Sequence, residues 1–295
     1  MNCFELFDGV ITSEAPLFRK NFDKVRATFG EVWAQDLDVH LERLFGYDEA
    51  AYRKAVSGYA KFSLSAMRLQ ARFNRTRQYE EQSYEDACRN VYQNEEFMAN
   101  VYLPGIFASQ FLWQHHYRQI LFHREQFLPL LKGIEDRRFY DVGTGTGFYS
   151  VQVMQHAPGF RGYGIDTSPH ARQFTAKHVA GWGFGEAYTP MDVNIIESDL
   201  EALPCVQSIE VLEHLSDPEL FLRSLRKMLR PGGYGFIAAA ITAPEDDHIY
   251  LYWTPEDVIR QLNNTGFEVL DYREEAGYEG IPGEIVPKVA AFIVR

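Results

Sequence analysis

Two different hydrophobic periods divide the chain. Up to about residue 135, apolar positions recur with the spacing of amphipathic helices, aromatic residues are frequent and glycines are few. From Arg137 onward, short β-rich apolar runs alternate with amphipathic stretches, which is the pattern of a parallel sheet covered on both faces. The pattern predicts a helical domain at 1–135 and an α/β domain at 136–295.

Capping residues and helix breakers give approximate element boundaries in both parts. In the first part, helices are expected over 16–30, from Asp48 through Met67, from a capping box at Ser83 and Asp86, over 105–123, and in a short segment that stops near Gly133. In the second part, strands are expected near 138–142, 161–166, 187–192, 205–209, 234–240, 267–272 and 288–294. No helix separates the last two strands, so the final one should be antiparallel. The predicted architecture is a Rossmann-like, doubly wound, seven-stranded sheet behind a helical lid.

Charge and composition narrow the possible partners. The 295 residues include 29 Lys and Arg against 41 Asp and Glu, a net charge of −12. Binding to nucleic acid or to an anionic membrane needs clustered basic residues, so neither partner is expected. No apolar run approaches the roughly 18 residues of a membrane span, and the N-terminus lacks signal-peptide features, which favours a cytoplasmic protein. Cys3, Cys88 and Cys205 are far apart and are predicted to be free thiols.

The most informative segment is a glycine-rich turn between a strand and a helix. The strand ends in Asp141, and the glycines follow at alternate positions, Gly143, Gly145 and Gly147. A dinucleotide fingerprint would need its third glycine at position 148, which is Phe148. A carboxylate at the strand end would also repel a pyrophosphate, and no Gly-Lys-Ser/Thr follows the loop. The segment therefore favours a cationic ligand.

Residues 137–295 resemble the class I S-adenosylmethionine (SAM) dependent methyltransferases. The first motif of that superfamily is Asp/Glu-x-Gly-x-Gly-x-Gly, and this loop matches it. The resemblance implies SAM as cofactor, with its methionine part against the glycine loop and its charged end beside Asp141. A second motif of that superfamily is an acid after strand 2 that holds both ribose hydroxyls, and Asp166 occupies that position. One carboxylate can accept hydrogen bonds from two neighbouring hydroxyls.

Three further motifs follow in the order of that superfamily. Asp192 is the expected contact of the adenine amine, with Val193 beside it, although Asp199 lies in a similar local sequence. The segment 208–215 follows strand 4, and Ile209 within it is expected to contact the cofactor. The Leu-Arg-Pro-Gly-Gly segment at 229–233 precedes strand 5.

The acceptor side of the site is less marked in the sequence. In-line methyl transfer mainly requires alignment and exclusion of water, and a base is needed only for a weakly acidic nucleophile. His116 and Tyr117 are the predicted catalytic residues; His115 is expected to point away from the face that His116 occupies. Candidate walls of the acceptor pocket are four aromatic residues that could equally be core residues, Trp113, Tyr117, Tyr102 and Phe107.

A metal site is an open alternative. Glu210, Glu213 and His214 share a face if they lie on one helical turn, and His248 follows strand 5 at the same sheet edge. This arrangement resembles the metal site of the ubiquinone-pathway O-methyltransferases and of the small-RNA terminal 2'-O-methyltransferases. The same Glu-Val-Leu-Glu-His segment is widespread in superfamily members without metal, so no metal is included in the predicted site.

The predicted function is transfer of a methyl group from SAM to an oxygen, nitrogen or carbon atom of a small metabolite, in secondary or cofactor metabolism. The Asn/Asp-Pro-Pro-Tyr motif of base and glutamine methyltransferases is absent after strand 4. The alternatives are SAM-dependent cyclisation or aminocarboxypropyl transfer, and a SAM-binding regulator without catalysis. The sequence leaves the oligomeric state open.

Overall fold

The computed structural model describes residues 2–280 and 282–295 of the chain. Its described residues before Arg138 contain helices and no strand. The longer helices of this part are α1 (Cys3–Glu14), α2 (Arg19–Phe45), α3 (Glu49–Thr76), α6 (Leu103–Leu112) and α7 (Gln114–Phe122). Its short helical segments are η1 (Pro16–Phe18), α4 (Tyr84–Ala87), η2 (Cys88–Tyr92), α5 (Glu95–Phe97), η3 (Met98–Tyr102), η4 (His123–Phe127) and η5 (Leu128–Gly133).

Two predicted helix starts are confirmed by their caps. The Asp48 carboxylate accepts hydrogen bonds from the first amides of α3, and Ser83 and Asp86 form the capping box that opens α4. Helix α1 was not predicted. The run expected to end at Gly30 does leave the helical conformation there: Gly30 has φ 69° and ψ −150°, and α2 consists of two helical segments joined by a kink at this glycine.

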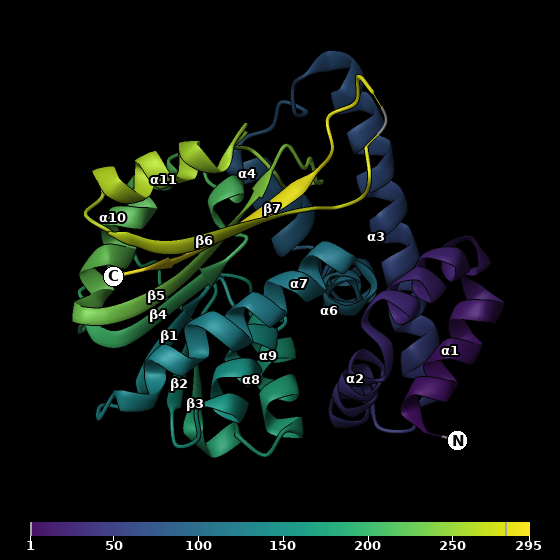
Figure 1. The fold of residues 1–295 in the computed structure, drawn as a ribbon, viewed down its shortest axis with the longest axis horizontal. Helices are drawn as coiled ribbons and strands as arrows, with labels where there is room; N and C mark the ends of the chain where they lie inside the picture. Colours follow the sequence, from purple (N-terminus) through teal and green to yellow (C-terminus); the bar gives the residue numbers. More distant parts are fainter. Residues whose placement is uncertain (1, 281) are drawn as a thin grey trace.

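The single helix expected over 105–123 is two helices. Trp113 adopts an extended conformation (φ −105°, ψ 120°) between α6 and α7. Sequence periodicity could not show this break, because the sequence contains no glycine or proline there. The break turns the chain and lets α7 lie between α6 and the sheet (Figure 1).

The second part forms a seven-stranded sheet of order β3-β2-β1-β4-β5-β7-β6. Strand β7 runs antiparallel to the other strands of the sheet, as predicted. The strands are β1 (Arg138–Val142), β2 (Arg161–Ile165), β3 (Tyr188–Met191), β4 (Leu203–Ile209), β5 (Leu229–Ile241), β6 (Val269–Ala276) and β7 (Lys288–Val294). The helical segments between them are α8 (Phe148–His156), α9 (Pro169–Gly181), η6 (Gly185–Ala187), η7 (Leu212–His214), α10 (Pro218–Met228) and α11 (Pro255–Asn264).

Consecutive strand residues point to opposite faces, and each face has its own core. On β1, Phe139 packs into a cluster with α8, α9 and the N-terminal helices, whereas Tyr140 packs with α10 and α11. The first cluster runs continuously from α1 to β7. The helical part and the sheet therefore share one hydrophobic core, although their sequences have different hydrophobic periods.

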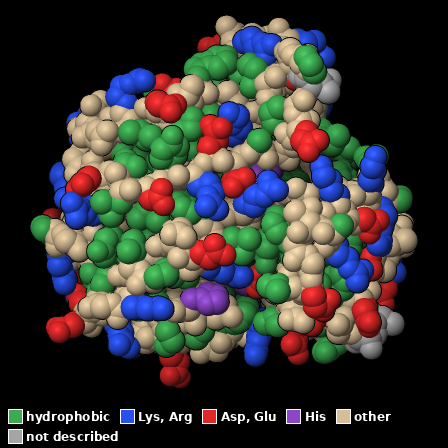
Figure 2. All heavy atoms as spheres, in the orientation of Figure 1, with side chains coloured by type: hydrophobic (Ala, Val, Ile, Leu, Met, Phe, Trp, Pro, Cys, Tyr) green, Lys and Arg blue, Asp and Glu red, His purple; other side chains and the backbone are tan. Residues whose placement is uncertain are grey.

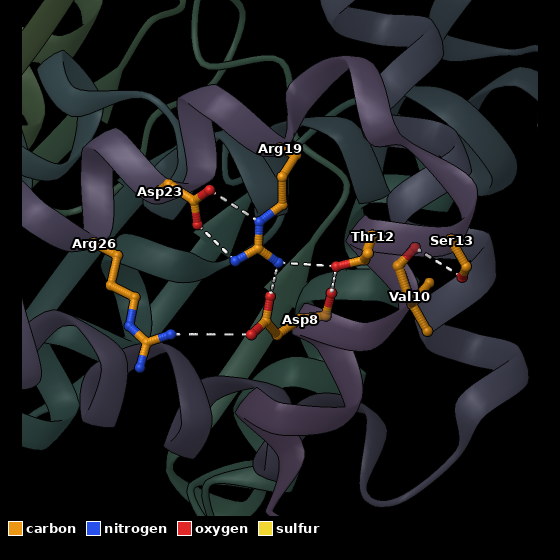
Figure 3. A network of polar contacts seen from close by, with 7 residues as sticks. All are labelled: Asp8, Val10, Thr12, Ser13, Arg19, Asp23 and Arg26. Atoms are coloured by element: carbon orange, nitrogen blue, oxygen red, sulfur yellow. Dashed lines mark hydrogen bonds and ion pairs between the residues drawn. The ribbon is translucent and has the colours of Figure 1, made fainter.

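The corner between α1 and α2 is fixed by a polar network centred on Arg19. Its guanidinium binds Asp8 of α1 and, through Nη2 at 2.6 Å and Nε at 3.0 Å, both oxygens of Asp23 on α2 (Figure 3). The corner includes Leu17 and Phe18, which line the main cavity of the protein.

The loop between β6 and β7 crosses to the helical part and contacts α3 (Figure 1). The Gln70 side chain donates to the Ile285 carbonyl at 2.8 Å, and the Ile285 amide donates to Asn74 at 2.8 Å. Arg77 donates to the Gly283 carbonyl at 3.2 Å. These contacts hold together one wall of the cavity, which is formed by segments far apart in sequence.

Among the described residues, no helix has the length and apolar character that a membrane span requires. Cys3, Cys88 and Cys205 are free thiols, as predicted.

Candidate active site

The carboxyl ends of the central parallel strands open into a cavity of about 1380 Å³. Pockets for one drug-sized ligand measure roughly 300–1,000 Å³, so this cavity has room for a cofactor and a second molecule. One side is lined by the glycine loop and the ends of β1, β2 and β4. The other side is lined by α2, α3, α6, α7 and the β6–β7 loop.

The glycine loop has the backbone geometry that its sequence requires. Gly143, Gly145 and Gly147 have φ values of 75°, 50° and 68°, in the region that side chains disfavour. A Cβ on Gly143 would lie 2.3 Å from Val211, and one on Gly147 would lie 2.6 Å from Thr175. A Cβ on Gly145 would meet no atom within 4 Å, so the loop is open at this position and a ligand can approach its backbone.

Two carboxylates border this loop. Asp141 is 2% exposed and accepts a hydrogen bond from Ser150; burial raises its pKa to about 6. Asp166 accepts from the Gly145 amide at 3.0 Å and from the Ser168 amide at 2.9 Å, and burial raises its pKa as well. A cation beside Asp141 would offset the desolvation of its carboxylate. Asp141 therefore fits the charged end of SAM, and the carboxylate of Asp166 fits the ribose hydroxyls.

The structure does not bring Asp192 to the cavity. Its side chain is 68% exposed and forms an ion pair with Arg172 at 2.8 Å. The next residues turn inward, so that Val193 and Asn194 line the cavity, as does Ile209 after β4. Asn194 was not among the predicted contacts; its amide could meet the adenine amine, but no local motif distinguishes it.

A polar pair lies between the two sides of the cavity. The Nε2 atom of His116 is 3.6 Å from an oxygen of Glu210, whose other oxygen accepts from Gln119 at 3.2 Å. His116 Nδ1 lies 3.1 Å from the hydroxyl of Ser109. Burial lowers the pKa of His116 to about 3 and raises that of Glu210 to about 6. Glu210 also has a φ of 54°, a strained conformation typical of functional sites.

Tyr117, the second predicted catalytic residue, lies away from the cavity. Its hydroxyl donates to Asp36 at 3.2 Å and its ring packs against Phe29 and Phe111. The geometry gives it a structural role in the helical part. His115, which was expected to point away from His116, also lines the cavity, and the two rings are 4.4 Å apart. Both histidines lie in the first turn of α7, which begins at Gln114 beside the cavity.

Two of the four candidate aromatic walls line the cavity, and the other two belong to the core. Trp113 and Tyr102 line it. Phe107 and Tyr117 are each 1% exposed within the shared core. The Tyr102 hydroxyl donates to Asp247 at 2.5 Å, and so does the Tyr92 hydroxyl at 2.9 Å.

Three of the four candidate metal ligands converge. Each of Glu213, His214 and His248 offers a ligand atom, and these atoms lie within 4.8 Å of one another. Glu213 is fully buried, and neither of its carboxylate oxygens has a hydrogen-bond partner. The other ring nitrogen of His248 is held by the Ala243 carbonyl, an orientation often seen in metal-binding histidines. The carboxylate of Glu210 is directed to His116 and Gln119 instead.

Comparisons with known proteins identify a methyltransferase domain. A family model described as a methyltransferase domain matches residues 140–234. A ubiquinone biosynthesis O-methyltransferase of Parvibaculum lavamentivorans is 32% identical over 108 residues, 37% of this chain and 42% of the relative. A tRNA U34 carboxymethyltransferase of Cellvibrio japonicus is 29% identical over 145 residues, 48% of this chain and 44% of the relative. The chain thus matches less than half the length of these two relatives.

Two solved structures share the fold over most of the chain. The mitomycin 7-O-methyltransferase MmcR has a TM-score of 0.54 and 13% identity, and the match covers 83% of this chain and 71% of that one. PigF, solved with S-adenosylhomocysteine (SAH), has a TM-score of 0.54 and 14% identity, with coverage of 85% and 77%. The family match, the ordered motifs and the sheet topology together show that residues 140–234 belong to a methyltransferase domain with the class I SAM-dependent fold.

Proposed function

We propose that the protein is a SAM-dependent methyltransferase that modifies a small molecule, with the helical part acting as the lid of the site. The observation that carries the proposal is the position of Asp141, Gly145 and Asp166 on the wall of the same cavity as His116 and Glu210. A cofactor held by the first three would share one enclosure with an acceptor held near the other two.

Bound SAM supplies a methyl group on a positively charged sulfur. Asp141, Gly145 and Asp166 would hold SAM, which would give its methyl group to a lone pair of the acceptor and leave as SAH. A proton on the acceptor heteroatom must leave as well. We infer that Glu210, whose carboxylate lies 3.6 Å from His116, would receive it; a positioned base typically contributes about 10²–10⁴ in rate.

A small acceptor is favoured over tRNA, although one relative acts on tRNA. The described lining of the cavity contains ten acidic and three basic side chains, which disfavours a polyphosphate. On the face shown in Figure 2, acidic and basic side chains are interspersed, with no continuous basic surface among the residues described. The net charge of −12 acts in the same direction.

Calorimetry and product analysis test the proposal. The protein is expected to bind SAM and SAH, and turnover should release SAH together with a methylated acceptor. Release of methylthioadenosine would instead indicate cyclisation or aminocarboxypropyl transfer. Tight binding without turnover on any acceptor would favour a regulator. Absence of SAM binding would refute the proposal.

A second candidate is metal-assisted transfer to a hydroxyl, favoured by the unpartnered Glu213 carboxylate beside His214 and His248. These residues would hold a divalent cation, which would acidify a bound hydroxyl. Calorimetric titration with Zn²⁺, Mn²⁺ and Mg²⁺ is expected to show one site that Glu213→Gln removes. Activity that survives chelation, together with no metal binding, would eliminate this candidate.

A further inference from the structure

We propose that Tyr188 of β3 is a positioning residue for the cofactor and acts on Asp141 through the hydroxyl of Ser150. This inference rests on the proposed function, in which Asp141 lies beside the charged end of SAM. The three side chains come from β3, β1 and α8, so they meet only in the folded protein. Tyr188 is not part of the cavity wall, and its effect on the cofactor is indirect.

Two glycines of β2 leave the space that Tyr188 occupies. Strand β2 lies between β1 and β3, with Gly162 opposite Tyr188 and Gly164 opposite Asp141. A Cβ on Gly162 would lie 2.5 Å from the ring of Tyr188, and a Cβ on Gly164 would lie 1.9 Å from its hydroxyl. Positions two apart on a strand face the same side of the sheet. The phenol therefore crosses β2 over two positions without side chains and ends at the level of Asp141.

The hydroxyl groups form a chain of hydrogen bonds with one direction. Ser150 has a single hydroxyl hydrogen, which it donates to Oδ2 of Asp141. The hydroxyls of Tyr188 and Ser150 lie 2.9 Å apart, so Tyr188 must donate to Ser150. Tyr188 is 6% exposed and Ser150 is fully buried, so bulk water cannot replace either bond. Hydrogen bonds in such a chain polarise one another, which strengthens the bond that Asp141 receives.

The other surroundings of Asp141 disfavour its charge. Burial raises its pKa to about 6; the hydrogen bond from Ser150 lowers the pKa, and the carboxylate of Asp166 raises it. The uncharged side chains of Tyr149 on α8 and Cys205 on β4 also lie near this carboxylate. Within the described part of the chain, Asp141 forms no ion pair. The chain of hydroxyls is therefore a main source of stabilisation for the ionised form.

The charge of Asp141 decides how well a cation binds beside it. A hydrogen bond donated to a carboxylate stabilises the ionised form and lowers its pKa. Without the Tyr188 hydroxyl, Ser150 would be a weaker donor, and Asp141 would take up a proton at higher pH. A neutral carboxyl group does not attract the ammonium group of the cofactor. The hydroxyl of Tyr188 thus extends cofactor binding to lower pH and restrains the carboxylate.

Binding of SAH, measured by calorimetry between pH 5 and 7, tests the inference without turnover. In the wild type, the affinity should decrease as the pH falls through about 6, where Asp141 takes up a proton. Tyr188→Phe should bind about three-fold more weakly at pH 7 and should move the midpoint of this decrease up by about half a pH unit. Because burial also raises the pKa of Asp166, the comparison uses the shift between proteins and not the midpoint itself.

Two further variants show whether Tyr188 acts through Ser150. Ser150→Ala removes the direct donor to Asp141 and should weaken binding about ten-fold, with a shift of about one pH unit. If the two residues act in one chain, the double variant Tyr188→Phe/Ser150→Ala should match Ser150→Ala alone. Additive shifts in the double variant would contradict the proposed chain.

Tyr140→Phe is the matched control, because Tyr140 is a buried tyrosine of β1 in the core on the other face of the sheet. It should leave the affinity and the midpoint unchanged. Weaker binding of Tyr188→Phe by the same factor at every pH would give Tyr188 a structural role only and overturn the proposal, as would wild-type behaviour of Tyr188→Phe. Absence of SAH binding in the wild type would instead refute the proposed function, and this inference with it.

Discussion

The two sides of the cavity are built in different ways. On the cofactor side, the main contacts come from a few strand ends, and each lies within a short motif such as the loop from Asp141 to Gly147. On the acceptor side, contacts join segments such as Gln70 and Ile285, which are 215 positions apart. Sequence motifs therefore predict most contacts on the cofactor side, whereas the contacts on the acceptor side are visible only in the tertiary structure.

The largest effect should come from breaking the core that connects the two sides. Phe111 of α6 is fully buried and meets Phe148 of α8 edge-on at 5.6 Å. Phe111→Ala should lower the free energy of unfolding by about 3–5 kcal/mol. Because the core is shared, chemical denaturation followed by circular dichroism and by fluorescence should still show one transition.

Leu64→Ala is the matched control, because Leu64 is 47% exposed on α3 and should change the stability by less than about 0.5 kcal/mol. Two separate transitions for Phe111→Ala would mean that the helical part and the sheet unfold independently.

The cofactor side can be tested with a pair of acids. Asp166→Ala removes a carboxylate that orders Gly145 and faces the cavity, so SAM affinity should fall by at least about 100-fold, since each charge-assisted hydrogen bond is worth about 1.5–3 kcal/mol. Asp192→Ala changes an exposed side chain outside the cavity and should alter the affinity by less than about two-fold. A larger loss of SAM affinity for Asp192→Ala than for Asp166→Ala would restore the prediction that Asp192 contacts the adenine amine.

The pH dependence of stability tests the contribution of His178, which contacts the glycine loop. His178 Nδ1 lies 2.9 Å from the Thr146 carbonyl, and burial lowers its pKa to about 4. Below pH 6.5 His178 is protonated in the unfolded chain but stays neutral in the folded protein. The free energy of unfolding therefore decreases as the pH falls towards 4. Between pH 7 and 5 this histidine should cost about 2 kcal/mol.

His178→Asn keeps a donor near the carbonyl without titrating in this range. The variant should therefore lose about 2 kcal/mol less than the wild type between pH 7 and 5 in urea denaturation. Equal losses in the two proteins would show that His178 does not contribute to the acid sensitivity.

The smallest expected effect concerns the corner that supplies part of the acceptor side. Arg19→Met removes the network of Figure 3 but keeps an apolar stem. Because these ion pairs are partly exposed, stability should fall by only about 1 kcal/mol, and SAH affinity should not change. A loss of SAH affinity would connect this corner to the cofactor side, contrary to the comparison above.

The strands and the cofactor loop could be predicted from the sequence because their signals are local. The expected ranges 138–142 and 288–294 are those of β1 and β7, and the antiparallel final strand followed from the missing helix. Strand β5 is longer than predicted, since the Pro-Gly-Gly segment expected to precede it lies within it. These features depend on turn residues and on alternation over a few positions.

The acceptor side could not be predicted because it depends on backbone irregularities and distant contacts. The extended Trp113 separates α6 from α7 without a glycine or proline, and both His115 and His116 line the cavity in the first turn of α7. Tyr117 is adjacent in sequence, yet it is bound to Asp36, 81 positions away. The inward turn after Asp192, which places Asn194 on the cavity wall, has no sequence motif.

The hydrogen bond from the Gly145 amide to Asp166 has a consequence for protein engineering. It makes the glycine turn and the acid after β2 one exchangeable unit, although 21 positions separate them. A chimera that takes the glycine turn from another enzyme, without the acid that follows β2 in that enzyme, would lose this hydrogen bond between amide and carboxylate. Grafts that carry both segments together should retain cofactor binding more often than grafts of either segment alone.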